Sequence, residues 1–103
     1  MLESEYQSKL IKKIKRMFPN CYVLKNDTDY LQGIPDLLIL YQDKWAMLEV
    51  KADRLAPNQP NQTWYICELN DMSFAAFIYP DIEEEVLHAL QQAFGIERLA
   101  RVS

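Results

Sequence analysis

Two apolar runs joined by a short polar turn occupy the middle of the chain and limit the folds open to it. The turn is Gln42-Asp43-Lys44, and the flanking runs have the length and composition of strands that pair antiparallel around it. Asp36 opens the first run, whereas Glu49 and Lys51 close the second. Antiparallel pairing brings the start of one strand beside the end of the other. We therefore expect these three charged side chains to converge at one edge of a sheet.

The alternation of side chains along the second strand gives two of these charges a common direction. Glu49 and Lys51 are predicted to point to one face of the sheet, and Val50 to the other. Burying two carboxylates and an ammonium group among apolar strands is costly unless they pair or hold a cation. Two interpretations follow. Either the three residues form a chemical site, or Asp36 is a strand-start or turn residue and Glu49 and Lys51 form a pair at the edge of the sheet.

The rest of the chain alternates between helical and strand patterns. Tyr6, Leu10 and Ile14 recur at helical spacing, and Pro57 and Pro60 exclude a helix interior between them. The pattern predicts, in chain order, a helix over 2–18, a strand over 21–24, the hairpin, a loop over 56–60, a helix over 61–70, a strand over 73–79 and a last helix from 80–81 to about Gly95. The helix over 61–70 is expected to bury Trp64 or Tyr65 together with Ile66 and Leu69.

This order predicts the fold class. Strands two to four are nearly continuous apolar runs, as expected when helices cover both faces of a sheet. We therefore predict an α/β fold with a mixed sheet flanked by helices on both faces. A length of 103 residues favours a single domain over 1–103.

Composition narrows the cellular setting and complicates the choice of partner. No apolar run is long enough to cross a bilayer, and the N-terminus is charged, so we expect an intracellular protein without a membrane partner. Cys21 and Cys67 lack metal-ligand spacing and are expected to be free thiols. The net charge of −4 does not favour nucleic-acid binding. The basic residues, however, concentrate in the first quarter of the chain and the acidic run lies at 81–85, so net charge does not decide the partner.

These elements resemble a known nuclease superfamily. The order αβββαβ, with Pro35-Asp36 opening the second strand and Glu49-Val50-Lys51 closing the third, is similar to the restriction-endonuclease-like core of the PD-(D/E)XK superfamily. The chain most resembles its small stand-alone VRR-NUC nucleases, often carried by phages, and is also similar to Holliday junction resolvases. The forms Gly33-x-Pro35-Asp36 and Pro57…Gln62-x-x-Tyr65 favour the VRR-NUC side. The chain departs from it at Phe77-Ile78-Tyr79-Pro80, where a Val-Arg-Arg-like stretch is expected.

The resemblance implies a metal-dependent endonuclease that hydrolyses DNA phosphodiesters, with branched, flap and junction DNA as candidate substrates. Mg²⁺, for which Mn²⁺ can substitute, takes only one or two protein carboxylates, which Asp36 and Glu49 would supply. The Val50 carbonyl is the third metal ligand that the resemblance implies. Lys51 is assigned a catalytic role in positioning water and stabilising charge, because two nearby carboxylates favour its charged form. The expected location is the cytoplasm of a bacterial host or a phage-infected cell.

Other site residues are predicted on the first and second helices. Glu5 is the candidate for an N-terminal catalytic acid that supports the metal, and it is favoured over Glu3 because it flanks the apolar stripe at Tyr6. Three basic residues follow it on one ridge and are candidates for DNA contact: Lys9, Lys12 and Arg16. That ridge is equally compatible with a solvated face. Gln62 is a candidate nucleic-acid contact, with a capping or loop role as the alternative.

Two other functions stay open at this stage. The chain could be a non-catalytic nucleic-acid-binding module on the same fold, or a protein-interaction subunit that uses its apolar faces. A chain this small offers little surface to a DNA duplex, and two cuts in opposite strands require two active sites. We therefore expect a homodimer, with the fourth strand, the last helix or the first helix at its interface. A monomeric mass in light scattering would reject this expectation.

Overall fold

The computed structural model describes residues 1–95 as three α-helices around a four-stranded mixed sheet. The elements, in chain order, are α1 (Glu3–Met17), β1 (Tyr22–Lys25), β2 (Leu37–Tyr41), β3 (Lys44–Val50), α2 (Gln62–Met72), β4 (Phe74–Ile78), a 3₁₀ turn (Pro80–Ile82) and α3 (Glu83–Ala93). The predicted order of elements and the predicted α/β class with a mixed sheet are confirmed. The last eight residues of the predicted 1–103 domain lie outside the described residues.

The sheet order is β1-β2-β3-β4, so the strands lie side by side in the order in which they occur in the chain. β1 pairs antiparallel with β2, and β2 pairs antiparallel with β3 around the predicted turn. β4 pairs parallel with β3, because the chain returns through α2 before it forms β4. A loop, rather than another hairpin turn, therefore follows β3, and the side chains at the end of this strand lie beside that loop.

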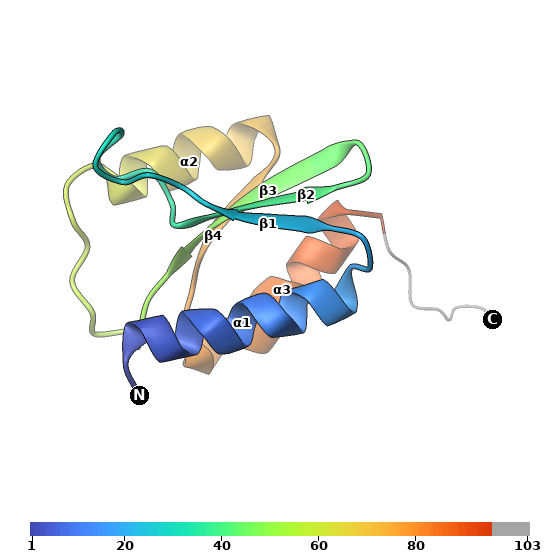
Figure 1. Cartoon of the computed structure of the whole chain (residues 1–103). Helices are drawn as coiled ribbons and strands as arrows, with labels where there is room; N and C mark the ends of the chain where they lie inside the picture. The colour runs from blue at the N-terminus through green and yellow to red at the C-terminus, as the bar shows by residue number, and fades with distance from the viewer. Residues whose placement is uncertain (96–103) are drawn as a thin grey trace.

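Helices cover both faces of the sheet, as predicted (Figure 1). α1 and α3 pack on one face, where they bury the larger core. Its members come from α1, the sheet and α3: Tyr6, Leu10, Ile14, Phe18, Leu37, Ile39, Ala46, Leu48, Val50, Ile78, Leu87, Leu90 and Phe94. α2 packs on the other face over a smaller core of Ile34, Leu69 and Ala75, with Met47 and Tyr65 against it. Successive residues of β3 therefore alternate between the two cores.

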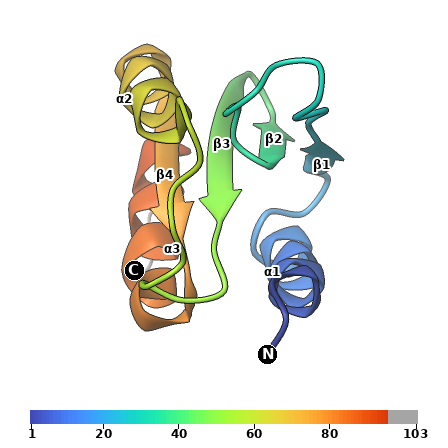
Figure 2. The ribbon, with the colours of Figure 1, turned by 90° about the vertical axis from the view of Figure 1, so that its left-hand side faces the viewer.

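The covering by α2 is incomplete. This helix contacts β4 and β3, and Figure 2 shows it beside that half of the sheet. The edge strand β1 consequently leaves Tyr22 and Leu24 exposed. The apolar stripes of α1 and α3 are buried in the larger core. Among residues 1–95, every helix is too short or too polar to span a bilayer.

Several predicted boundaries shift by one or two residues. The largest difference lies after β4, where Pro80 and Asp81 form part of a 3₁₀ turn and α3 begins only at Glu83. Within α2, Tyr65 packs against the smaller core, whereas Trp64 is 59% exposed. Gly95 has a φ of 77° directly after α3, which fits its predicted role as a helix terminator.

Candidate active site

The β2–β3 register places Asp36 across from Glu49. Leu37 pairs with Leu48, so the next step along both strands brings Asp36 opposite Glu49. Asp36 also reaches across the pair with its side chain, because its Oδ2 accepts a hydrogen bond from the Val50 N–H at 2.9 Å. The predicted convergence of Asp36 with the end of β3 is therefore present in the structure.

Asn26 fixes the backbone from which Asp36 projects. Its Nδ2 donates to the Pro35 carbonyl at 2.8 Å, and its backbone N–H donates to the Asp36 carbonyl at 2.8 Å. The backbone bond extends the β1–β2 ladder by one residue beyond Lys25, and the side-chain bond holds the preceding carbonyl. Asn26 was not predicted as a site residue, since an asparagine after a strand is an ordinary loop signal.

Glu49 and Lys51 leave the sheet on the same face, and α2 begins there. Gln62, in the first turn of α2, bonds to both residues. Its Nε2 donates to Glu49 Oε2 at 2.9 Å, and its Oε1 accepts from Lys51 Nζ at 2.8 Å. Lys51 Nζ also donates to the Pro57 carbonyl at 3.0 Å. Val50 points the other way into the larger core, so the predicted alternation of these side chains is confirmed.

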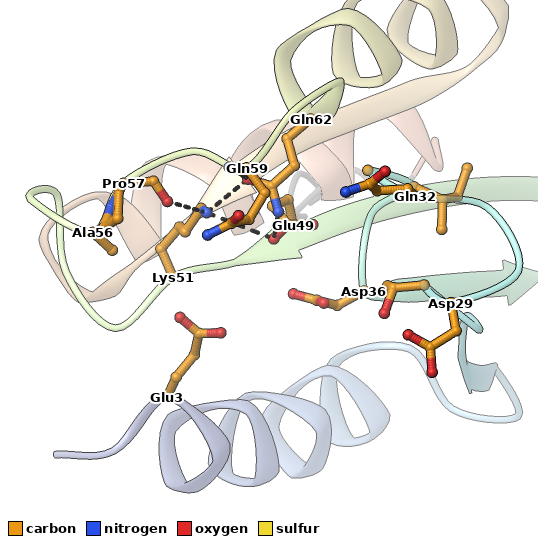
Figure 3. A pocket seen from close by; sticks show the side chains of 13 residues that line it. Glu3, Asp29, Gln32, Asp36, Glu49, Lys51, Ala56, Pro57, Gln59 and Gln62 are labelled. Atoms are coloured by element: carbon orange, nitrogen blue, oxygen red, sulfur yellow. Dashed lines mark hydrogen bonds and ion pairs between the residues drawn. The ribbon is translucent and has the colours of Figure 1, made fainter.

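A cleft of about 520 Å³ is lined by Asp36, Glu49, Lys51 and Gln62 (Figure 3). Glu49 is 3% exposed, Lys51 7% and Gln62 8%, whereas Asp36 is half-buried. The cleft is framed by the loop before β2, the loop between β3 and α2, and the first residue of α1. Its lining includes Glu3, Asp29, Gln32, Asp36, Glu49, Lys51, Gln59 and Gln62.

Glu49 has one oxygen in use and one without a partner. Its Oε2 accepts from Gln62 and lies 3.9 Å from Lys51 Nζ. Its Oε1 is buried and has no hydrogen-bond partner within the part of the chain that the structure describes. Leaving a buried acceptor unpaired costs about 1–3 kcal/mol, and more for a charged group. A cation at this oxygen would remove that cost.

The electrostatics of the two acids also favour a cation. Burial raises the pKa of Glu49 to about 8, and the negative charge of Asp36 acts in the same direction, against the opposing effect of Lys51. Burial likewise raises the pKa of Asp36, while its hydrogen bond from the Val50 N–H opposes that rise. The two carboxylates therefore resist joint ionisation in the metal-free protein. A divalent cation stabilises both ionised forms.

The donor set fits a hard divalent cation that keeps most of its water. Within residues 1–95, no three His, Cys, Asp or Glu side chains form a group that could hold a metal ion. Asp36 and Glu49 are two carboxylates, and Mg²⁺ characteristically takes one or two. The chemistry of the pair and the unpartnered Oε1 of Glu49 therefore match Mg²⁺ better than a cation that needs a complete protein cage.

The structure brings Glu3, rather than Glu5, to the cleft. Glu3 points from the start of α1 toward the space beside Asp36 and Lys51 (Figure 3). Glu5 is exposed and its Oε1 accepts from the Leu2 N–H at 3.0 Å, which satisfies one of the free donors at the helix start. The sequence did not distinguish the two residues, because both glutamates lie in the first turn of α1.

The predicted basic ridge lies outside the cleft. Lys9, Lys12 and Arg16 line a separate hollow between α1 and the segment at Pro80 and Glu83. Val50 does not line the cleft, and its backbone N–H is engaged by Asp36. Gln62 does line the cleft, but its amide is occupied by contacts within the protein. Asp29, in the loop before β2, also lines the cleft.

The chain gives no match to models of known families, to curated proteins or to solved structures. The chemistry of the cleft is accordingly inferred from its own residues.

Proposed function

We propose that this chain is a Mg²⁺- or Mn²⁺-dependent endodeoxyribonuclease with the restriction-endonuclease-like core of the PD-(D/E)XK superfamily. The observation that carries the proposal is the placement of Asp36 opposite Glu49, with Lys51 on the same face of β3 and an unpartnered Glu49 oxygen in the cleft. The αβββαβ order of elements supports the superfamily, and the motif Gly33-x-Pro35-Asp36 supports its VRR-NUC branch.

The proposed roles follow from the contacts of each residue. Asp36 and Glu49 would hold the cation, and the Val50 carbonyl would be its third protein ligand. When bound, the cation supplies neutralisation of phosphoryl charge and a water that ionises more readily. Lys51 is held by Gln62 and the Pro57 carbonyl, so its ammonium group is fixed beside the two acids. From there it would orient the attacking water and offset negative charge that develops on the phosphate.

Substrate binding is proposed for the outer parts of the molecule. The ridge of Lys9, Lys12 and Arg16 would contact the phosphate backbone away from the cut, since it lies on α1 but outside the cleft. Glu3, at the start of the same helix, would take the supporting acidic role that the sequence suggested for Glu5. A cleft recessed between two loops favours DNA with an accessible strand, such as a flap or branch, over a continuous duplex.

Cleavage assays test the proposal. The substrates are flap, branched, single-stranded and duplex DNA of one sequence, each with Mg²⁺, with Mn²⁺ and with a chelator. We expect metal-dependent cleavage by the wild type, and a loss of at least about 100-fold in Asp36→Ala, Glu49→Ala and Lys51→Ala, because each removes an electrostatic contact at the reacting phosphate. Asp71→Ala removes an exposed carboxylate of α2 outside the cleft and should cleave like the wild type.

The outcomes separate the proposal from its two alternatives. Absence of cleavage with both metals, or full activity in Asp36→Ala and Glu49→Ala, contradicts the nuclease assignment. Tight metal-independent binding of branched DNA without turnover would instead indicate a binding module. No nucleic-acid binding even at low salt, where phosphate contacts are strongest, would favour a protein-interaction subunit.

A further inference from the structure

The amide of Gln62 stands between the two charged groups that end β3. Its Oε1 accepts from Lys51 Nζ at 2.8 Å and from the Gln59 N–H at 2.9 Å, and its Nε2 donates to Glu49 Oε2 at 2.9 Å. The residue is 8% exposed, so these contacts are made away from solvent. One side chain therefore connects the Lys51 ammonium group, the Glu49 carboxylate and the loop that precedes α2.

Only one orientation of this amide suits its neighbours. The flipped amide would direct N–H donors at the Lys51 ammonium and the Gln59 N–H, and would direct its oxygen at the Glu49 carboxylate. Each of those pairings sets a donor against a donor or an acceptor against an acceptor. The amide oxygen thus faces the positive charge of Lys51, and the amide NH₂ group faces the negative charge of Glu49.

The amide also keeps Lys51 and Glu49 apart. Their closest charged atoms are 3.9 Å from each other, at the outer limit of an ion pair. Without the intervening amide, the two long side chains would be free to close on each other in a poorly solvated cleft, where opposite charges attract strongly. A closed ion pair would use the Glu49 oxygens that a cation needs.

We propose that Gln62 is a positioning residue that separates Lys51 from Glu49 and holds Glu49 so that its Oε1 stays free to bind the divalent cation. The inference rests on the proposed nuclease function and adds how the metal site is kept open. It replaces direct contact with nucleic acid as the role of Gln62, since both polar ends of its side chain are engaged within the protein. A purely structural role, in which Gln62 only joins the loop to α2, is the competing explanation.

Mn²⁺ binding to the full chain distinguishes these roles without any nuclease assay. Gln62→Met keeps the length of the side chain and removes its polar atoms, and Gln62→Asn keeps an amide that is one methylene shorter. We expect the dissociation constant for Mn²⁺ to rise about 10- to 100-fold in both variants, which is the usual effect of removing a group that orients a metal ligand. Free Mn²⁺ is measured by electron paramagnetic resonance, and circular dichroism checks that each variant is folded.

Thr63→Val is the matched control. Thr63 Oγ1 accepts from Asn58 Nδ2 at 3.2 Å, an exposed bond between the same loop and the same turn of α2. Removing this bond should leave Mn²⁺ affinity unchanged. In cleavage assays, Gln62→Asn should lower kcat and leave KM for DNA unchanged, whereas a residue that contacts DNA would raise KM.

The results that overturn the inference differ from those that overturn the nuclease proposal. If the wild type binds Mn²⁺ and folded Gln62→Met or Gln62→Asn binds it equally well, Gln62 does not position the metal ligands, although the nuclease proposal stands. If both variants fail to fold, the role of Gln62 is structural and the inference is wrong. If the wild type itself binds no Mn²⁺, the metal-dependent function fails, and the inference fails with it.

Discussion

Glu49 is the residue whose ionisation should control the stability of the metal-free protein. Burial raises its pKa to about 8 from an ordinary value of 4.5, so the folded chain holds this proton more tightly than the unfolded chain does. Stability should therefore fall as the pH rises from about 4.5 to about 8. Each pKa unit corresponds to about 1.4 kcal/mol, so we expect a total loss on the order of a few kcal/mol.

Urea unfolding between pH 5 and pH 9 in the presence of a chelator, a range chosen to span roughly the expected window, measures this dependence. Glu49→Gln should flatten the curve and be more stable than the wild type at the alkaline end, because its side chain cannot ionise. Adding Mn²⁺ should restore wild-type stability there and leave the variant unchanged. The control is Glu68→Gln, which removes an exposed carboxyl of α2. A wild-type curve that rises toward pH 9 would contradict the description of Glu49.

For single residues, the sequence predicted that Asp36 and Glu49 come together but not which contacts hold them in place. Alternation along β3 and the turn at Gln42 were sufficient to bring Asp36 to Glu49. The contacts of Asn26 and Gln62 could not be predicted, because both depend on how irregular loops close over the sheet. Such loops have no periodicity from which a side chain's direction can be read.

Among the elements, the two loops that frame the cleft meet at Gly33. A Cβ at this position would lie 2.7 Å from the Pro60 carbonyl oxygen and 2.7 Å from Asn61 Cβ, and the φ of Gly33 is 93°. Only glycine adopts this backbone readily and fits the contact. Gly33 therefore lets the loop before β2 pack against the residues that lead into α2 and Gln62.

Gly33→Ala should destabilise the fold by roughly 1–3 kcal/mol from backbone strain alone, and the clash with the second loop adds to this loss. Because the clash lies next to Gln62, Mn²⁺ affinity should fall as well. Gly95→Ala is the control, since Gly95 has a φ of 77° but nothing within 4 Å of an added Cβ. Urea unfolding and Mn²⁺ titration of both variants measure the difference. Equal effects of the two substitutions would show that the packing of the two loops at Gly33 is unimportant.

Element order was predictable because the apolar patterns of the strands and helices are long and regular. The choice between Glu3 and Glu5 was not, since two residues along a helix differ by about 200° in direction. Which of them faces the cleft depends on the rotation at which α1 docks on the sheet. The exposure of Trp64 has a similar origin, because α2 covers only the half of the sheet formed by β3 and β4.

For the whole molecule, whose net charge is −4, the basic ridge on α1 is the candidate surface for the proposed DNA substrate. Lys9, Lys12 and Arg16 share one hollow along α1, and Glu83, which begins α3 and its acidic run, lines the same hollow and pairs with Lys13. If the ridge binds phosphates, replacing its three residues with alanine should weaken binding to all DNA sequences alike. The slope of log affinity against log salt concentration should fall by about 0.7–0.9 for each phosphate that the variant no longer neutralises.

Fluorescence anisotropy over a range of salt concentrations measures that slope, with a chelator present to prevent cleavage. Lys44→Ala is the control, because Lys44 bonds Asp43 at the hairpin end of β3, away from the cleft. An unchanged slope in the triple variant would show that the ridge is only a solvated face.

The proposed chemistry depends on Asp36 and Glu49 sharing one divalent cation, and crystals soaked in Mn²⁺ would show whether they do. Anomalous scattering locates Mn²⁺ independently of any assumption about the site. We predict a peak in the cleft within coordination distance of the Asp36 carboxylate and of Glu49 Oε1, with Lys51 still bonded to Gln62. A cleft in which these two carboxylates bind no Mn²⁺ at saturating concentration, or in which Lys51 pairs directly with Glu49, would show that the proposed metal site is wrong.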